Sequence, residues 1–486
     1  MKRLFPQAGW LALVAVVAVL ERLALWLAYP PVTYDDSNSY RRLAEQILGA
    51  APFDGTRSPG YPIFLAWLGP DLVVYAAQLI LGLATTLLFF YLGWLVTGKE
   101  WVGVAAALIH TLNMGQLLFE ATLLAETLTT FLMLLTLCGG VYFLKKGTFE
   151  FNPKELGLAF LTGLAGGLAA QVRPQFVFLP FLVAFFIFIE AARKSILVED
   201  QNLNHEGAQS GTQKTSSSSF VLFMSFARPG VGWARVVKAL KTLTPNKKLW
   251  VLVFSITIPA LLINALWLNY IHTQFGVWSM SSVDGYHIVQ HTGKFFEYVP
   301  DEHAAIRDTF LKYRAQQIAR TGKPSNTIWA AVPELKEVSG LGFYKLSRKL
   351  QEISGQLIRE HPLLYLVSVF ESWAWFWSAP FYWTPQAFGA AAPLLDALAQ
   401  VQRAVLWAAN AAFIAGTFAL AFGRVRKAFA MPASLWLMLA VVWTNSILQA
   451  IVQASENPRY SVSTQTLVLL VVAWWVWKVL RKERVA

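Results

Sequence analysis

The sequence contains one cysteine, Cys138, and only 14% of its residues are charged. A single thiol cannot form an internal disulfide, and it cannot supply a cysteine-ligated zinc site, which needs several such ligands. Soluble domains carry about 25% charged residues, so this shortage of charge excludes a soluble enzyme. Cys138 lies within an apolar run, where it is expected to pack in a core.

Apolar residues make up 56% of the 486 residues. At about 20 apolar residues per membrane span, this content predicts around ten spans and a modest water-exposed part. The apolar segments, of which 362–400 is ambiguous, are 8–28, 71–96, 101–117, 121–144, 156–172, 174–192, 249–271, 362–400, 402–422, 432–453 and 462–480. Lys2 and Arg3 precede the first segment and no small-residue cleavage site follows it, so we expect an uncleaved anchor.

The net charge of +12 marks cytoplasmic loops rather than a nucleic-acid partner. Basic clusters after alternate spans place the N-terminus and the 193–248 loop in the cytoplasm, and that loop holds nine Lys and Arg against three acids. Residues 272–361 then lie outside. Because 402–422 must return the chain to the basic cluster at Arg424, residues 362–400 cross either twice or not at all. The prediction is an all-α polytopic membrane protein of about 10–12 helices with a small extracytoplasmic domain.

Hydrophilic stretches divide the chain into three parts. They are an N-terminal transmembrane catalytic module, 1–271, with an outer loop at 30–62 and a cytoplasmic insert at 193–248; an extracytoplasmic domain, 272–361; and C-terminal interfacial and transmembrane helices, 362–486. The extracytoplasmic domain should contain two amphipathic helices, at about 301–320 and 343–360. Within the insert, residues 199–219, which include Ser216–Ser219, are expected to be disordered. No internal repeat is evident, which weakens a transporter interpretation.

Seven ionisable residues are expected at the outer ends of the spans. The acids are Asp35, Asp36, Glu120 and Glu126, and the arginines are Arg57, Arg173 and Arg459. An ionisable residue within a span costs about 2–3 kcal/mol on insertion scales, so such residues usually pair or bind something. Guanidinium groups match phosphate oxygens bidentately, and a carboxylate can take a proton from a hydroxyl. The cluster therefore predicts chemistry on a lipid phosphate at the outer surface.

Structural roles compete with these functional ones. Asp36 could simply cap a helix that begins near Ser37. Glu126 and Arg173 could be partners in a structural ion pair, an interpretation as strong as the functional one. Arg57 could have no role beyond stabilising the tight turn at Ser58.

Two other patterns have simpler interpretations. His287 and His291 are spaced to share one helix face and could bind a metal, but a polar surface role is stronger because no carboxylate partner is evident. Gly163, Gly166 and Gly167 predict close helix packing rather than a phosphate loop, since no strand precedes them.

Four stretches follow in a characteristic order on one side of the membrane. They are Asp36–Ala44, Gly49–Ala66, Leu123–Leu128, and the pair Gly167–Pro174 with Glu456–Tyr460. Together they resemble the GT-C class of membrane glycosyltransferases, which includes protein O-mannosyltransferases and lipid A aminoarabinose transferases. The resemblance covers 1–192 and 432–480. It departs from the protein O-mannosyltransferases at Asp35-Asp36, where that family has an Asp-Glu pair, and the outer domain shows no recognisable carbohydrate-binding module.

The resemblance implies inverting transfer of a sugar from a polyprenyl-phosphate carrier to an acceptor hydroxyl at the extracytoplasmic face of a bacterial inner membrane. Asp36 would be the catalytic base and Glu126 a second acid, while Arg173 and Arg459, assisted by Arg57, would bind the donor phosphate. Further substrate contacts are expected from Tyr40, Tyr61, Glu120, Glu456, Tyr460 and Asp35. The acceptor could be a glycan, a lipid or a protein.

No cofactor is required, although Asp36 and Glu126 could hold a divalent cation. Two other functions stay open. A transporter or flippase of lipid-linked saccharide would use the same arginines without a base, and an O-antigen-type ligase or polymerase is kept open by His287 and His291.

Overall fold

The computed structural model describes residues 8–146, 152–206, 247–379, 381–454 and 458–483. Within these residues the chain folds into helices and loops, and the sole extended pairing is an isolated bridge between Val32 and Thr122. Eight of the described helices are long and apolar enough to cross a membrane, or ten if two bent pairs each count as one span. The all-α, multi-pass architecture is confirmed. Most of the insert expected at 193–248 lies outside the described residues.

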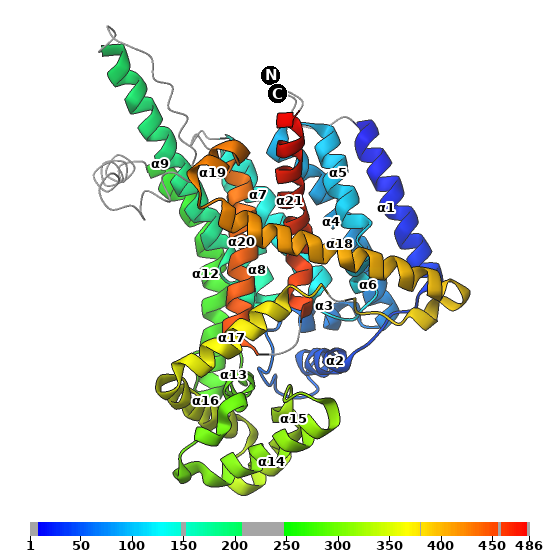
Figure 1. The fold of residues 1–486 in the computed structure, drawn as a ribbon, viewed down its shortest axis with the longest axis vertical. Coiled ribbons are helices and arrows are strands. Elements are labelled where there is room, and N and C mark those ends of the chain that lie inside the picture. Colours follow the sequence, from blue (N-terminus) through cyan, green and yellow to red (C-terminus); the bar gives the residue numbers. More distant parts are fainter. Residues whose placement is uncertain (1–7, 147–151, 207–246, 380, 455–457, 484–486) are drawn as a thin grey trace.

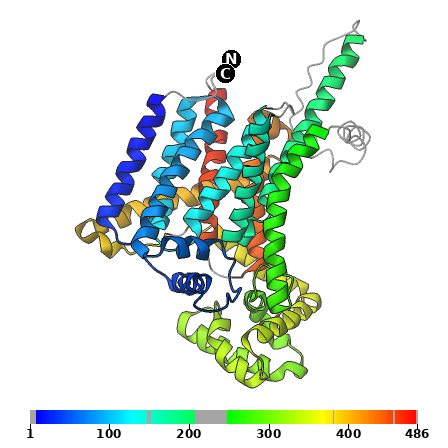
Figure 2. The ribbon, with the colours of Figure 1, turned by 180° about the vertical axis from the view of Figure 1, so that it is seen from behind.

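The long helices run side by side in one bundle, with the start of the first and the end of the last at the same end (Figures 1 and 2). They are α1 (Ala8–Ala28), α4 (Asp71–Thr97), α7 (Glu126–Lys146), α8 (Pro153–Val172), α9 (Leu179–Glu206), α12 (Lys247–Phe275), α20 (Ala433–Val452) and α21 (Val462–Glu483). Each corresponds to an apolar segment of the sequence. The start of α7 differs, because the expected span began at residue 121 and the helix begins at Glu126.

Small residues let α8 and α12 approach closely. A Cβ at Gly163 would overlap the backbone of Ile256, and a Cβ at Gly167 would lie 2.8 Å from the Cα of Ala260. The packing role expected for these glycines is confirmed. Cys138 is buried in the main hydrophobic core, as its apolar surroundings predicted.

The segment expected as one span at 101–117 is broken in two. Helices α5 (Glu100–Thr111) and α6 (Met114–Glu120) meet at 63°. The break is stabilised by Asn113, whose side chain accepts a hydrogen bond from the backbone N–H of Gly115 at 3.0 Å and so caps α6. The bend turns Glu120, at the end of α6, toward the interior of the bundle, where it is buried.

The region 362–400 contains no helix that qualifies as a span by length and composition. It holds α17 (Pro362–Phe376), the 3₁₀ turn η4 (Pro385–Ala391) and the start of α18 (Ala392–Ala419). Helix α18 crosses the bundle obliquely (Figure 1) and is followed, after a 120° bend, by α19 (Gly423–Phe429). Of the two alternatives, the structure favours the one in which 362–400 does not cross, with α18 as the tilted segment that returns the chain.

Residues 276–361 form an appended domain at the opposite end of the bundle from the start of α1 (Figure 1). Its helices are α13 (Asp284–Thr292), α14 (Ala304–Thr321), α15 (Thr327–Ser339) and α16 (Phe343–Glu360), with 3₁₀ turns η2 (Gly293–Tyr298) and η3 (Asp301–His303). The two helices expected near 301–320 and 343–360 are confirmed as α14 and α16, while α13 and α15 were not anticipated. The domain has a hydrophobic core of its own, separate from that of the bundle.

Two serines hold the start of the appended domain to the loop that precedes α3 (Gly60–Leu68). Ser281 Oγ donates to the carbonyl of Thr56 at 3.0 Å, and Ser282 Oγ donates to that of Asp54 at 2.9 Å. The backbone N–H of Ser282 donates to the carbonyl of Gly55 at 2.9 Å. These bonds fix the appended domain over the end of the bundle.

Asp284, at the start of α13, gives the appended domain a pH-dependent stability. Burial raises its pKa to about 6, although a hydrogen bond from Ser279 lowers it in part. A carboxyl whose pKa is raised by folding stabilises the domain below its unfolded value, near 3.8, and this contribution is lost as the pH rises through about 6. We expect Asp284→Asn to raise stability above about pH 7 by on the order of 1–3 kcal/mol, with no gain near pH 4.

Thermal unfolding of the detergent-purified protein at several pH values measures this effect. The control is Glu337→Gln, which removes an exposed carboxylate from the same domain. Melting curves of Asp284→Asn that run parallel to wild type from pH 4 to pH 8 would contradict the burial argument.

Candidate active site

A cleft of about 870 Å³ lies between the end of the bundle and the appended domain. The membrane part contributes Asp35, Asp36, Arg57, Tyr382, Arg459 and Tyr460 to its wall. The appended domain contributes His287, Asn326, Trp329 and Phe343. The first group is dominated by charged and phenolic side chains and the second carries no formal charge, so the two sides of the cleft differ in chemistry.

The isolated bridge places the two predicted catalytic acids near each other. Val32 N–H donates to the carbonyl of Ala121 at 2.8 Å, and Leu123 N–H donates to the carbonyl of Val32 at 3.0 Å. Shortly after each strand of this bridge a helix begins, and each helix carries an acid in its first turn. These acids are Asp36 in α2 (Asp35–Ile47) and Glu126 in α7.

The helix boundaries correct one expectation. Helix α2 begins at Asp35 and its N-cap is Tyr34, so Asp36 is not the cap of a helix that starts near Ser37. Asp36 lies in the first turn, where the helix dipole favours a negative charge.

Two arginines bind the carboxylate of Asp36. Arg57 pairs with one oxygen and Arg459 with the other. Arg57 is itself held by Ser39 Oγ, which accepts from its Nε at 3.2 Å, and by Tyr40, whose ring centroid lies 4.7 Å from its Cζ. Burial alone would raise the pKa of Asp36, but the charges of Arg459 and Arg57 hold it well below its ordinary value. Arg57 therefore does more than stabilise its own turn, because it forms an ion pair with Asp36.

Glu126 forms a second, deeper ion pair. Arg173 binds its Oε1, and the Nε of Arg459 lies 3.6 Å from the same oxygen. The side chains of Glu126, Arg173 and Arg459 are 3%, 8% and 6% exposed, whereas those of Asp36 and Arg57 are 25% and 28% exposed. Because Arg459 contacts both acids, the pairs form one network that is buried at Glu126 and partly open at Asp36. The Cζ atoms of Arg173 and Arg459 lie 4.8 Å and 5.5 Å from the ring centroid of Tyr460. The structural pairing of Glu126 with Arg173 is present, and it is part of the predicted cluster.

The network carries a surplus of positive charge. Three guanidinium groups face two carboxylates, which leaves one positive charge uncompensated within this set. Two buried atoms of the network, Glu126 Oε2 and Arg459 Nε, have no hydrogen-bond partner among the described residues. Buried polar atoms are normally satisfied. The surplus charge and the unsatisfied Nε–H donor of Arg459 therefore suit an anion, whereas Glu126 Oε2 is an acceptor and suits a donor such as a hydroxyl.

Tyr40 and Tyr61 lie beneath the cleft rather than in its wall. Both are buried, and their rings meet edge to face at 4.9 Å. Tyr61 donates to Gln78 Oε1 at 3.0 Å, and Gln78 Nε2 donates to the carbonyls of Glu120 and Thr122. These bonds hold α3 and α4 against the segment that leads into α7, so Tyr61 and Gln78 fix the position of the helix that carries Glu126.

Glu120 lies inside the bundle, apart from the cleft. Its Oε1 accepts from Arg22 of α1 at 2.6 Å, and both side chains are buried. Arg22 also donates to Thr111 at 2.9 Å and to Thr86 at 3.3 Å. This pair joins α1 to α4, α5 and α6. Glu120 was expected from the sequence as a substrate contact, and Arg22 was not expected. Glu456, for which a substrate contact was also expected, lies outside the described residues.

The two histidines have different surroundings. His287 lines the cleft, whereas His291 is buried and its Nδ1 lies 2.9 Å from Ser368 Oγ. Burial and the charge of Arg57, opposed by the charge of Asp36, together lower the pKa of His287 to about 4. His287 is therefore neutral at pH 7. The sequence predicted a polar surface role for His287, but its side chain lies in the wall of the cleft.

A divalent cation does not suit this donor set. Asp36 and Glu126 each face guanidinium groups, which would repel a metal ion held between them. Across the described parts of the chain, no group of three or more His, Cys, Asp and Glu side chains could hold a metal.

Other residues of the cleft were not anticipated. Asn326 and Trp329 come from the appended domain, Gln453 from the end of α20, and Tyr382 from the segment after α17. Nothing in the local sequence marks them as cleft residues, because each reaches the cleft only through the packing of distant segments.

No family model matches this chain, and no curated protein matches it. Three solved structures do. The oligosaccharyltransferase AglB from Archaeoglobus fulgidus, in complex with an inhibitory peptide and a dolichol-phosphate, aligns with 98% of this chain and 51% of its own, at 13% identity and a TM-score of 0.49. ArnT from Cupriavidus metallidurans, bound to undecaprenyl phosphate, aligns with 96% of this chain and 78% of its own, at 15% identity and a TM-score of 0.31.

This chain thus spans about half the length of AglB. At these identities and TM-scores the likenesses do not establish a shared activity, and GT-C membership stays a prediction.

The pair of Arg22 and Glu120 makes a testable contribution to stability. Arg22→Met should destabilise the protein by about 3–5 kcal/mol, because it leaves the buried carboxylate of Glu120 without its cation. The double variant Arg22→Met/Glu120→Leu should regain most of this loss, since it removes both charges. Thermal unfolding in detergent measures both effects. A double variant as unstable as the single one would show that packing, rather than charge pairing, is what Arg22 contributes.

Proposed function

We propose that the chain is an inverting glycosyltransferase that moves a sugar from a polyprenyl-phosphate carrier to an acceptor hydroxyl. The observation that carries the proposal is the network in which Asp36 and Glu126 share Arg459 at the edge of the cleft. It combines phosphate-binding cations with a carboxylate at the end of a membrane bundle, where a lipid-linked phosphate would lie. By the positive-inside expectation, this end is extracytoplasmic.

The surplus positive charge suits a carrier phosphate. A sugar linked through one phosphate carries a single negative charge, which grows as the bond between the sugar C1 and the phosphate oxygen breaks. Arg459 and Arg57, with Arg173 behind them, would stabilise this growing charge. Such electrostatic stabilisation contributes about 3–4 kcal/mol per well-placed donor. The acceptor oxygen attacks C1 from the opposite face, its proton passes to the base, and the phosphate leaves with the electron pair.

Asp36 is the proposed base, and donor binding would activate it. In the free protein the two arginines hold its pKa low, which makes it a weak proton acceptor. A carrier phosphate competes with Asp36 for Arg459 and Arg57. When the phosphate takes up part of their charge, the pKa of Asp36 rises and the carboxylate becomes a stronger base only while the donor is bound.

The uncharged side of the cleft suits sugar recognition. Trp329 offers an aromatic face and Asn326 an amide, and sugars are bound by stacking and by such hydrogen bonds. The appended domain would therefore orient the sugar or its acceptor above the phosphate. The charged residues open to one end of the bundle, which favours transfer over transport across the membrane.

Asp36→Asn should lower the rate of transfer by about 10²–10⁴-fold, because the amide cannot accept the proton. Carrier binding should be at least as tight as in wild type, because the competing carboxylate is gone. In wild type the acid limb of kcat should lie about one pH unit or more above that of kcat/KM, since kcat reports the donor-bound enzyme, in which the pKa of Asp36 is higher. Both are measured with the donor found by screening polyprenyl-phosphate sugars.

Glu45→Gln, on the exposed side of the same helix, is the matched control. Full turnover by Asp36→Asn would exclude it as the base. Loss of turnover in His287→Gln with retention in Asp36→Asn would give that role to the neutral histidine in the cleft wall. Coincident acid limbs would contradict activation by the donor.

Arg459→Gln should weaken binding of undecaprenyl phosphate by about tenfold or more, because a charge-assisted hydrogen bond contributes about 1.5–3 kcal/mol. Native mass spectrometry of the detergent-purified protein measures the bound fraction at low salt. Arg348→Gln, an exposed arginine of α16, is the control. Unchanged affinity in a folded Arg459→Gln variant would show that this arginine is structural and that the phosphate site is misplaced.

A further inference from the structure

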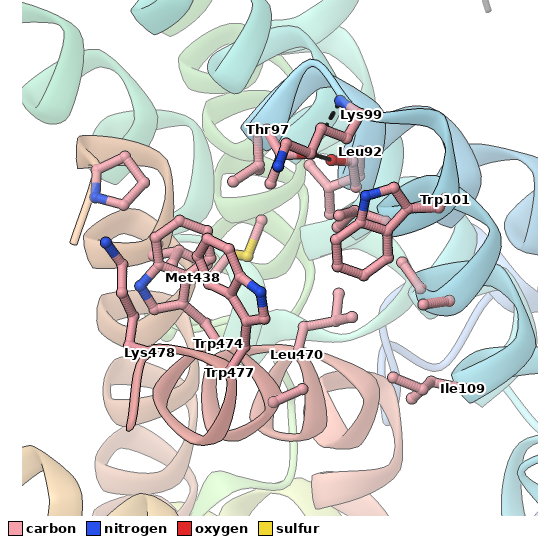
Figure 3. Close-up of a pocket in the computed structure, with 18 of the residues that line it drawn as sticks. Leu92, Thr97, Lys99, Trp101, Ile109, Met438, Leu470, Trp474, Trp477 and Lys478 are labelled. Atoms are coloured by element: carbon pink, nitrogen blue, oxygen red, sulfur yellow. Dashed lines mark hydrogen bonds between the residues drawn. The ribbon is translucent and has the colours of Figure 1, made fainter. Parts of the chain in front are cut away.

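A second cavity lies at the end of the bundle opposite the cleft. It is a groove of about 430 Å³ between α4, α5, α20 and α21 (Figure 3). Its inner part is apolar, with walls formed by residues such as Leu92, Ile109, Met438 and Leu470. The proposed transfer reaction uses none of these residues, so the groove needs a separate explanation.

Three cations lie at the mouth of the groove. They are Lys99, in the turn between α4 and α5, and Lys478 and Arg481 in the last turns of α21. No aspartate or glutamate is among the described residues that line the groove, and no ion pair of these three cations occurs within the described part of the chain. They are therefore available to an anion from outside the protein.

Tryptophan rings hold the cations in place. Lys99 Nζ lies 5.9 Å from the ring centroid of Trp477, and Lys478 Nζ lies 5.2 Å from that of Trp474. Arg481 Cζ is 5.5 Å from Trp477. Figure 3 shows Lys99 and Trp101 facing Trp474 and Trp477 across the groove. Tryptophan is enriched at the level of lipid headgroups, so the rings mark the depth at which the phosphates of one leaflet lie.

We propose that this groove binds an anionic glycerophospholipid. Its phosphate would lie against Lys99, Lys478 and Arg481, and one acyl chain would lie in the apolar part of the groove. Such a lipid is complementary to the groove in both charge and shape, because three cations at the mouth of an apolar groove match an anionic headgroup on an apolar chain. Basic pockets between membrane helices on the cytoplasmic side bind such headgroups, and this end of the bundle is the one predicted to be cytoplasmic.

The occupant differs from the proposed carrier. The groove opens at the opposite end of the bundle from the cleft, so a carrier phosphate bound to Arg459 cannot reach its cations. The inference goes beyond the proposed function and does not depend on it. Because a lipid that binds only the folded protein stabilises it by mass action, the groove should make thermal stability depend on headgroup charge.

The test compares phosphatidylglycerol with phosphatidylcholine of the same acyl chains, added to the delipidated full-length protein. Native mass spectrometry measures retained lipid, and thermal unfolding measures stabilisation. We expect phosphatidylglycerol to be retained preferentially and to raise the melting temperature. The triple variant Lys99→Gln/Lys478→Gln/Arg481→Gln should lower its affinity by on the order of 100-fold, given about 1 kcal/mol per basic residue near a lipid surface.

The matched control removes three exposed basic residues of the same end that lie outside the groove. It is Lys154→Gln/Arg424→Gln/Lys427→Gln, which should retain phosphatidylglycerol as wild type does. Arg459→Gln should also retain phosphatidylglycerol as wild type does. The lipid result therefore stands even if the experiments on transfer contradict the proposed function. Both triple variants are first checked for a monodisperse, helical state.

Four results would overturn the proposal. Equal retention of the two lipids by wild type would show that headgroup charge is not read. Equal loss in both triple variants would show a diffuse surface effect. Displacement of phosphatidylglycerol from the groove by a lower concentration of undecaprenyl phosphate would assign the groove to the carrier. An equal rise in melting temperature with inorganic phosphate alone would assign it to a free anion.

Discussion

Ionised side chains withdrawn from water at the end of a membrane bundle must be neutralised by partners, and this constraint fixes the geometry of the site. The partners here come from segments far apart in the chain. Asp36 and Glu126 begin two helices, whereas Arg173 ends α8 and Arg459 precedes α21. Because removing one charge would leave another buried without compensation, the first outer loop, the middle of the bundle and its last helix are held together by one network.

The network that stabilises this arrangement is also the one that a phosphate would bind. Its arginines are already paired with carboxylates, so an anion must compete with those carboxylates for every donor except the unsatisfied Nε–H of Arg459. The uncompensated positive charge and the unsatisfied Oε2 of Glu126 and Nε of Arg459 show that the exchange begins from an incompletely satisfied state. Residues that satisfied each other fully would make a more stable core and a poorer binding site.

The sequence was sufficient for most spans, because a lipid-facing helix is apolar on all sides and stands out by composition alone. Local pattern failed where tertiary contacts decide. The apolar run at 121–144 begins five residues before helix α7, which starts at Glu126, because Thr122 pairs with Val32 instead of joining the helix. Counting spans also placed the acids and arginines on one side of the membrane. Glu120 does not lie with the others, because the bend at Asn113 turns it toward Arg22 inside the bundle. Arg22 lies within a span and offered no signal of its own beyond its charge.

The cleft itself could not be derived from either of its parts. The bundle supplies charge but only one side of the cleft, and the appended domain, with its separate core, supplies an uncharged side containing Trp329 and His287. The position of one over the other depends on backbone carbonyls of 54–56 that accept from Ser281 and Ser282. Every residue has a backbone carbonyl, so the acceptors of these hydrogen bonds cannot be recognised from the sequence. The part of the site that would choose a sugar or an acceptor is therefore the part least accessible to sequence reasoning, while the part that would bind phosphate is encoded in ionisable residues that a membrane protein retains only at a cost.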